Sequence, residues 1–448
     1  MLARLKAKIK ALWQNKMTRN YVWVLLGQNA GSVFSILSLT ITLRLISVYD
    51  YGSLVIIQTY AALISGIFGL RTFNGIIKFS SEAEQDGSDL MLKKYLNTAI
   101  LLDFLSGAVA FGCSFALLKP IAMFMEWDLS TISLIHMYLP VILFTPIVQG
   151  APIGVLRKLG YFRHINICHA IVYGVQFAFL ALYLALGLHS FELILLTYAG
   201  THIAESIVLF VYAFLVVRKQ SCYRKFWKAG FTGNKAFWKY NFSFGVLLTF
   251  DQLLGHVSTL LINKYAGNFA TAYIKVITRI CAIFTKLTAP ISQIFYPELC
   301  DWIAQKKYRK AYKLSEKYFY IVLSGGATLV FLLFITFDIW IPIFEASMAA
   351  AKYESLLYFI YTLLTVSFIS FHQMSFALNM MRTNLITVGL LDVAYIVLLI
   401  PAILHFGVYG YLVLQILQAV LVFVIKLLVM RRIICKSERS EQTIAQEY

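Results

Sequence analysis

Three basic residues lie on one face of a single apolar segment and suggest the chemistry of the chain. The segment 272–295 contains Lys275, Arg279 and Lys286, which fall within about 40° of each other around a helix axis. A cation near the centre of a bilayer costs roughly 2.5–3.5 kcal/mol on insertion scales. The three side chains must therefore face protein or a water-filled cavity. A cationic cavity in a membrane favours an anionic substrate.

The composition is that of a membrane protein. The chain of 448 residues is 60% hydrophobic and 13% charged, its mean hydropathy is +0.75, and long apolar stretches recur along it. Because lipid offers no hydrogen-bonding partner to open backbone, these stretches must be helices. We expect an all-α polytopic protein with twelve transmembrane helices. The expected spans are Tyr21–Leu43, Leu54–Ile77, Tyr95–Leu118, Ile132–Leu156, Ile165–Leu186, Leu193–Val217, Phe242–Ile262, Ala272–Phe295, Tyr318–Ile341, Leu356–Met380, Leu385–Leu404 and Val408–Met430.

Basic residues are distributed unevenly between the two sides of the expected membrane. With a cytoplasmic N-terminus, the inside segments hold 30 of the 39 Lys and Arg residues, and the outside loops hold only Arg44, Lys119, Lys264 and Lys352. This is the positive-inside bias, and it predicts that both termini are cytoplasmic. The net charge of +18 thus orients the chain and does not indicate a nucleic-acid partner.

The two halves of the chain repeat one design. A shift of 219 residues aligns Tyr21 with Tyr240 and Arg163 with Arg382. Because six spans is an even number, both halves enter the membrane in the same direction, which predicts two six-helix parallel-repeat lobes around a central cavity. The expected domains are a basic amphipathic cytoplasmic leader (1–20), an N-lobe (21–217), a cytoplasmic linker (218–241), a C-lobe (242–430) and a cytoplasmic tail (431–448). The leader either lies along the headgroups as a helix or is a frayed basic tail.

Several stretches resemble a known family. The first two spans carry RLISVYDYGSLVIIQTY and FGLRTFNGIIKF, span 8 ends in FYPELCDWIAQKKYRKAYKL, and the last pair contains ALNMMRTNLITVGLL. Over nearly its whole length the chain resembles the Wzx-type O-antigen and polysaccharide flippases of the MOP superfamily, and the R-x(6)-Y-G turn after span 1 is the sharpest motif. Twelve spans set it apart from the lipid II flippases of that superfamily, which usually have fourteen.

The resemblance implies a function in lipopolysaccharide or other surface polysaccharide biosynthesis. Such a flippase translocates undecaprenyl-diphosphate-linked oligosaccharide across the bacterial inner membrane by alternating access, coupled to H+ or Na+. The implied partners are this lipid-diphosphate-linked oligosaccharide and the lipid bilayer, with a polysaccharide polymerase and chain-length proteins as further candidates. The substrate-binding cations would be Arg71, Lys275, Arg279 and Lys286.

Polar residues also line one face of span 2. Arg71, Asn74 and Lys78 stand at i, i+3 and i+7. Arg71 either extends to the cytoplasmic headgroups, as long basic side chains do, or offers its planar guanidinium to a diphosphate.

Asp251 is the first of three candidates for binding the coupled ion. It lies near the middle of span 7. It could instead neutralise Arg279 or Lys286 in a purely structural pair, because an unpaired charge in lipid is so costly.

Glu205 and Asp392 are the other coupling-ion candidates. Glu205 in span 6 lies one turn from His202, with which it could form a proton-sensitive pair, and Asp392 in span 11 has no evident partner. Asp103 in span 3 lies on a face of small residues that is typical of helix packing. For all three acids, an interhelical hydrogen bond is the simpler interpretation.

The remaining motifs narrow the function. The six cysteines form no C-x-x-C pair, which indicates neither a zinc site nor a disulfide, no Walker A sequence is present, and no cofactor is expected. The short outer loops argue against an enzyme. The alternatives are a multidrug or organic solute exporter of the same superfamily, which would favour acids over a triple-cation helix, and a membrane-embedded polysaccharide polymerase or glycosyltransferase, which usually needs a larger outer loop.

Overall fold

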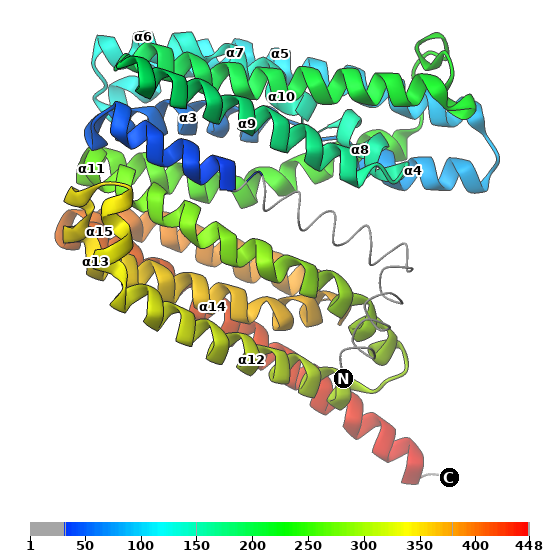
Figure 1. Ribbon diagram of the computed structural model, residues 1–448. Coiled ribbons are helices and arrows are strands. Elements are labelled where there is room, and N and C mark those ends of the chain that lie inside the picture. Colours follow the sequence, from blue (N-terminus) through cyan, green and yellow to red (C-terminus); the bar gives the residue numbers. More distant parts are fainter. Residues whose placement is uncertain (1–30, 32, 149, 379, 447–448) are drawn as a thin grey trace, which may run out of the picture. The chain divides into compact units, whose positions relative to one another are not determined.

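The computed structural model describes residues 31, 33–148, 150–378 and 380–446. These residues form helices and turns and contain no β-strand (Figure 1). Contacts divide the chain into two compact units, Met1–Lys264 and Tyr265–Tyr448. The leader predicted for residues 1–20 lies outside the described residues.

The first unit contains the helices that precede Lys264. They are Val33–Leu45, α3 (Val48–Phe68), α4 (Phe73–Gln85), α5 (Asp89–Met125), α6 (Leu129–Tyr138), α7 (Pro140–Val148), α8 (Ala151–Lys158), α9 (Phe162–Leu186), α10 (Phe191–Lys219), the 3-10 turns η1 (Ser221–Tyr223) and η2 (Phe226–Lys228), and the first limb of α11 (Lys235–Ala304). The expected division between the lobes lies at the linker 218–241, whereas the contacts group the helix limb after this linker with the first unit.

The second unit contains the remaining helices. They are the second limb of α11, α12 (Tyr308–Ile335), α13 (Phe337–Trp340), η3 (Ile341–Ile343), η4 (Ala346–Ala351), α14 (Lys352–Ala377) and α15 (Met381–Gln446). α14 packs against both α12 and α15.

Two long helices each contain two of the expected spans, and a glycine separates the two parts of each. α11 is interrupted at Gly267 (φ 86°) and α15 at Gly407 (φ 58°), backbone conformations that glycine adopts without strain. Each long helix is therefore two limbs, which correspond to the expected spans 7–8 and 11–12. Within the described residues, eight helical stretches are long and apolar enough to cross a bilayer, and one of them, Ile386–Cys435, is part of α15. The chain is thus a multi-pass membrane protein.

Spans 2 and 4 are broken, although each was predicted as one segment. Span 2 changes from α3 to α4 between Phe68 and Phe73. Span 4 consists of α6, α7 and α8, and its breaks lie near Pro140 and Pro152, because proline cannot donate the helical hydrogen bond. Figure 1 shows α8 beside α4, and the backbone of Phe73 lies 2.9 Å from where a Cβ of Gly154 would stand. The parts of spans 2 and 4 that follow the breaks, α4 and α8, are therefore closely packed.

Candidate functional site

Arg71 stands at the break in span 2. Its backbone is left-handed (φ 49°), and the residue is only 7% exposed. The end of α3 is held by the first limb of α11, where the Thr249 hydroxyl donates to the carbonyl of Gly66 at 3.0 Å. A broken transmembrane helix with a cation at the break is typical of transporter binding sites, where half-helix ends meet ligands.

Asp251 belongs to the same neighbourhood by its place in the chain. It follows Thr249 by two residues in the first limb of α11, so its backbone lies about 3 Å along the helix from the contact with α3. Its side chain lies outside the described part of the structure. The break at Arg71 and position 251 are thus at a similar height along the helices of the first unit.

Asp103 joins the breaks in spans 2 and 4. Its carboxylate accepts from the Thr72 hydroxyl at 3.0 and 2.9 Å and from the Ala151 backbone N–H at 2.6 Å. These donors stand at the N-termini of α4 and α8, which have unpaired N–H groups that a carboxylate can satisfy. A Cβ at Gly150 would lie 2.0 Å from the carboxylate, so the fit requires glycine. These are the interhelical hydrogen bonds that the sequence favoured for Asp103, although the two partners on other spans could not be named from the sequence.

The cationic stripe belongs to the second unit. Lys275 and Arg279 are half-buried on the second limb of α11, whereas Val276 and Ile277 are 0% and 2% exposed. The two cations therefore lie on the less buried side of a limb whose other side packs into the core. The side chain of Lys286 lies outside the described residues. Arg71 belongs to the other unit.

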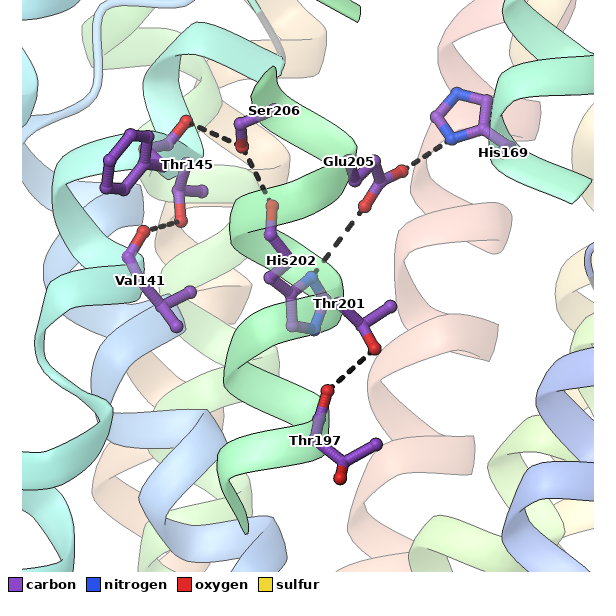
Figure 2. Close-up of polar contacts among 9 residues, drawn as sticks. Val141, Thr145, His169, Thr197, Thr201, His202, Glu205 and Ser206 are labelled. Atoms are coloured by element: carbon purple, nitrogen blue, oxygen red, sulfur yellow. Dashed lines mark hydrogen bonds and ion pairs between the residues drawn. The ribbon is translucent and has the colours of Figure 1, made fainter. Parts of the chain in front are cut away.

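Glu205 forms the clearest titratable cluster (Figure 2). One carboxylate oxygen is 2.5 Å from Nδ1 of His169 on α9, and the other is 3.8 Å from Nδ1 of His202, one turn away on α10. The carboxylate is 8% exposed, and the imidazoles are 26% and 41% exposed. An acid between two more accessible imidazoles can exchange protons with either. Spacing along the helix predicted His202, but His169 lies on a neighbouring helix and could not be found that way.

Hydroxyl groups fix the helix that carries this cluster. The Ser206 hydroxyl donates to the carbonyl of His202 at 2.9 Å and to that of Phe144 on α7 at 3.2 Å, and Thr201 bonds back to Thr197 (Figure 2). Glu205 therefore sits on a helix that is bonded to α7 on one side and to α9 on the other.

Asp392 has a partner that the sequence did not reveal. It accepts from the Gln418 amide at 2.5 Å, which joins the two limbs of α15. Nearby in the same unit, the ammonium of Lys426 lies 2.9 Å from Nδ1 of His372 on α14, and Lys426 is 4% exposed. Since an ammonium can only donate, this geometry makes the imidazole nitrogen an acceptor. In the described part of the chain no group of three His, Cys, Asp or Glu side chains is placed to hold a metal ion.

Comparison with known proteins decides the family. The polysaccharide biosynthesis protein family matches residues 17–301, more than half of the chain. The chain belongs to this family. No curated protein sequence matches the chain. The match agrees with the resemblance to the Wzx-type flippases of the MOP superfamily that the sequence motifs indicated.

Solved structures share the fold of this family member. An inward-facing multidrug resistance MATE family transporter of the MOP superfamily superposes with a TM-score of 0.77 at 11% identity, over 91% of this chain and 96% of that one. An outward-facing MATE transporter gives 0.66 at 12% identity, over 94% and 95%. A MOP superfamily transporter from Pyrococcus furiosus, described as having a binding pocket of reverse polarity, gives 0.59 at 12% identity, over 94% and 95%.

These likenesses establish the architecture. The fold is the twelve-helix membrane fold of MOP transporters, which confirms the predicted fold class. The family is one of polysaccharide biosynthesis, and the solved structures that share this fold are membrane transporters.

Proposed function

We propose that this polysaccharide biosynthesis family member is a flippase for lipid-linked oligosaccharide. Its substrate is an undecaprenyl-diphosphate-linked repeat unit of O-antigen or another surface polysaccharide. It moves this unit across the bacterial inner membrane by alternating access, with both termini in the cytoplasm. The lipid tail stays in the bilayer while the head group crosses.

The observation that carries this proposal is the cationic face of span 8. Lys275 and Arg279 are half-buried on the less packed side of the second limb of α11, where a charge in lipid would cost several kcal/mol. An anionic head group in a hydrated cavity removes that cost. Arg71, at the break in span 2, adds a guanidinium suited to phosphate oxygens. Membership of the polysaccharide biosynthesis family supports a polysaccharide precursor as this anion.

The ion that drives transport has three candidate binding residues. Glu205 is favoured for a proton, because two imidazoles at 2.5 and 3.8 Å can give protons to the carboxylate or take them. Asp392 is bonded to a neutral amide, which supplies no titratable partner at that contact. Asp251 is the candidate closest to the break at Arg71 along the helix that holds α3.

Export of multidrug or organic solutes is the second candidate function. The likeness to MATE transporters favours it at the level of fold. Its substrates are commonly organic cations, however, which the Lys275–Arg279 face would repel. The Pyrococcus furiosus relative, whose pocket is described as reversed in polarity, illustrates that this fold accommodates different pockets.

Complementation of a flippase-deficient strain tests the proposal. Arg279→Lys should retain most surface polysaccharide, whereas Arg279→Ala and Arg279→Glu should lose at least about tenfold, since a charge-assisted bond to phosphate contributes about 1.5–3 kcal/mol. Ile277→Val on the buried side of the same limb is the matched control. Full activity of Arg279→Glu at normal protein level would refute the anionic substrate.

A further inference from the structure

Two cations of the first unit are held by aromatic rings and not by acids. The Lys78 ammonium lies 4.8 Å from the centre of the Tyr240 ring, and the Arg157 guanidinium lies 5.3 Å from that of Phe73. Both cationic residues are exposed. In the described part of the chain, no carboxylate forms an ion pair with either of them.

The rings form a continuous row between these two cations. The rings of Tyr240 and Phe244 are parallel, with centres 6.2 Å apart, and Phe244 meets Phe73 edge to face at 5.9 Å. The row therefore runs from Lys78 on α4 through two rings of α11 to Phe73 and Arg157, so that three helices of one unit contribute. All three rings are partly accessible.

The framework beneath the row is closely packed. A Cβ at Gly75 would lie 2.3 Å from the Asn241 side chain, so α4 and α11 touch beside Tyr240. On the other side, the backbone of Phe73 lies against Gly154 of α8, three residues before Arg157. The rings and cations thus sit on packed helices and not on loops, which keeps a site pre-organised.

An aromatic ring and a carboxylate have different effects on the net charge of the cation that they contact. A carboxylate cancels the charge it pairs with, whereas the quadrupole of a ring attracts a cation and leaves its net charge in place. Lys158, the neighbour of Arg157, shows the contrast, because it pairs with Glu84 at 2.8 Å. The side chains of Lys78 and Arg157 are therefore held in place without losing their net positive charge, so they can bind an anion.

We propose that this row is a binding site for the head group of a phosphorylated lipid-linked sugar at the cytoplasmic end of the first unit. Lys78 and Arg157 contact phosphate oxygens, and the faces and edges of Tyr240 and Phe244 contact a sugar ring. The site lies on the half of span 2 that begins just after Arg71, so it would receive the substrate before the break. This inference rests on the proposed flippase function and adds residues that function does not require.

Binding of a polyprenyl diphosphate to the purified full-length protein tests the site. In native mass spectrometry or a fluorescence titration, Arg157→Gln and Lys78→Gln should each weaken binding by roughly tenfold, and Arg157→Lys should restore part of it. Tyr240→Leu should weaken binding of a diphosphate that carries a sugar more than binding of the bare diphosphate. Lys158→Gln is the matched control and should bind as wild type, because its charge is already paired.

The outcomes separate the site from the function. Unchanged thermal unfolding in detergent shows that each variant is folded, and a second variant, Arg157→Met, serves if Arg157→Gln is not. If wild type binds the diphosphate and Arg157→Gln and Lys78→Gln bind equally well, the site is overturned while the flippase proposal stands. An equal loss in Lys158→Gln also overturns it, because only general surface charge would then matter. If wild type binds inorganic pyrophosphate but no polyprenyl diphosphate, both proposals fail.

Discussion

In each unit one carboxylate joins the last two expected spans, but the side chains that it contacts differ in chemistry. In the first unit the acid is Glu205 on α10, and its partners are imidazoles. In the second unit the acid is Asp392 on the first limb of α15, and its partner is the amide of Gln418 on the second limb. After span 5 the repeat is about six residues shorter than the shift of 219, and the resulting offset of 213 residues aligns Arg218 with Arg431 and Glu205 with Gln418. The position that titrates in one half is therefore a neutral amide in the other.

This difference suggests a division of tasks between the halves. The Glu205 cluster can change its number of protons, because the carboxylate and both of its imidazole partners are ionisable groups. The second unit instead carries basic side chains at Lys275, Arg279 and Lys426. Under the proposed function, the first unit would bind the coupled ion and the second unit the anion.

The breaks in the spans follow the same asymmetry. In the first unit spans 2 and 4 are interrupted and meet at Asp103. In the second unit the counterpart of span 4 is α14, an uninterrupted helix of 26 residues. We therefore expect substitutions at shared positions to have unequal effects in the two units.

Removal of the Asp103 carboxylate should have the largest effect. Asp103→Ala leaves the Thr72 hydroxyl and the Ala151 N–H without their acceptor, and each buried unsatisfied group costs about 1–3 kcal/mol, so stability should fall by about 3–5 kcal/mol. Thermal unfolding in detergent measures this loss. Gly150→Ala should also destabilise, whereas Gly200→Ala, where a new Cβ meets nothing within 4 Å, is the control. Equal unfolding temperatures for the two glycine variants would contradict the shared junction.

The buried cation of the second unit should produce the next largest effect. His372→Leu leaves the Lys426 ammonium without its acceptor, and breaking one side of a buried polar pair costs on the order of 2–4 kcal/mol. Adding Lys426→Met should recover most of that loss, because an apolar pair of similar volume is tolerated. Protein level and thermal unfolding of the single and double variants give the answer. A double variant no better than His372→Leu would mean that the imidazole packs against something other than the ammonium.

The contact partners described above could not be predicted from the sequence. Hydropathy and charge predict the helical membrane fold, because the length and apolarity of each span depend only on the residues of that span. Span 4 was predicted as one segment, although Pro140 and Pro152 lie at its breaks and a proline cannot donate the helical hydrogen bond. The break at Arg71 has no proline, and it depends on contacts with Thr249 and Asp103 from other helices.

The candidate sites divide in the same way. The stripe of Lys275 and Arg279 and the pair of His202 and Glu205 follow from helical periodicity within one segment. His169 could not be found so, since the neighbour relation of α9 and α10 sets its contact with Glu205.

Exchange of glutamate and glutamine at the aligned positions 205 and 418 tests whether proton coupling belongs to the first unit. Glu205→Gln keeps the shape of the side chain but cannot exchange a proton, so proton-gradient-driven transport in vesicles should fall by about tenfold or more while exchange at equal pH is kept. His169→Gln should give a smaller loss, because His202 remains. Gln418→Glu is the reciprocal variant and should not restore coupling to Glu205→Gln, since no described imidazole bonds to Gln418. Gradient-driven transport by a well-folded Glu205→Gln protein would remove the coupling role.

The smallest expected effect concerns the start of span 4. Asp128 caps α6 by accepting from the Thr131 N–H at 2.9 Å, whereas α14 begins after Ala351 without a side-chain cap. Loss of such a cap costs about 1 kcal/mol, so Asp128→Ala should lower the unfolding temperature slightly.

Hydrogen bonds from Thr131 and Ser130 lower the pKa of the Asp128 carboxyl. Because the folded pKa is the lower one, the stabilisation is present above the unfolded pKa of about 4 and is lost as pH falls through the folded value. The difference between wild type and Asp128→Ala should therefore shrink below about pH 4. Ser130→Ala, which keeps the backbone contact, is the control and should lose less. A difference that grows on acidification would show that the carboxylate does not cap the helix as an anion.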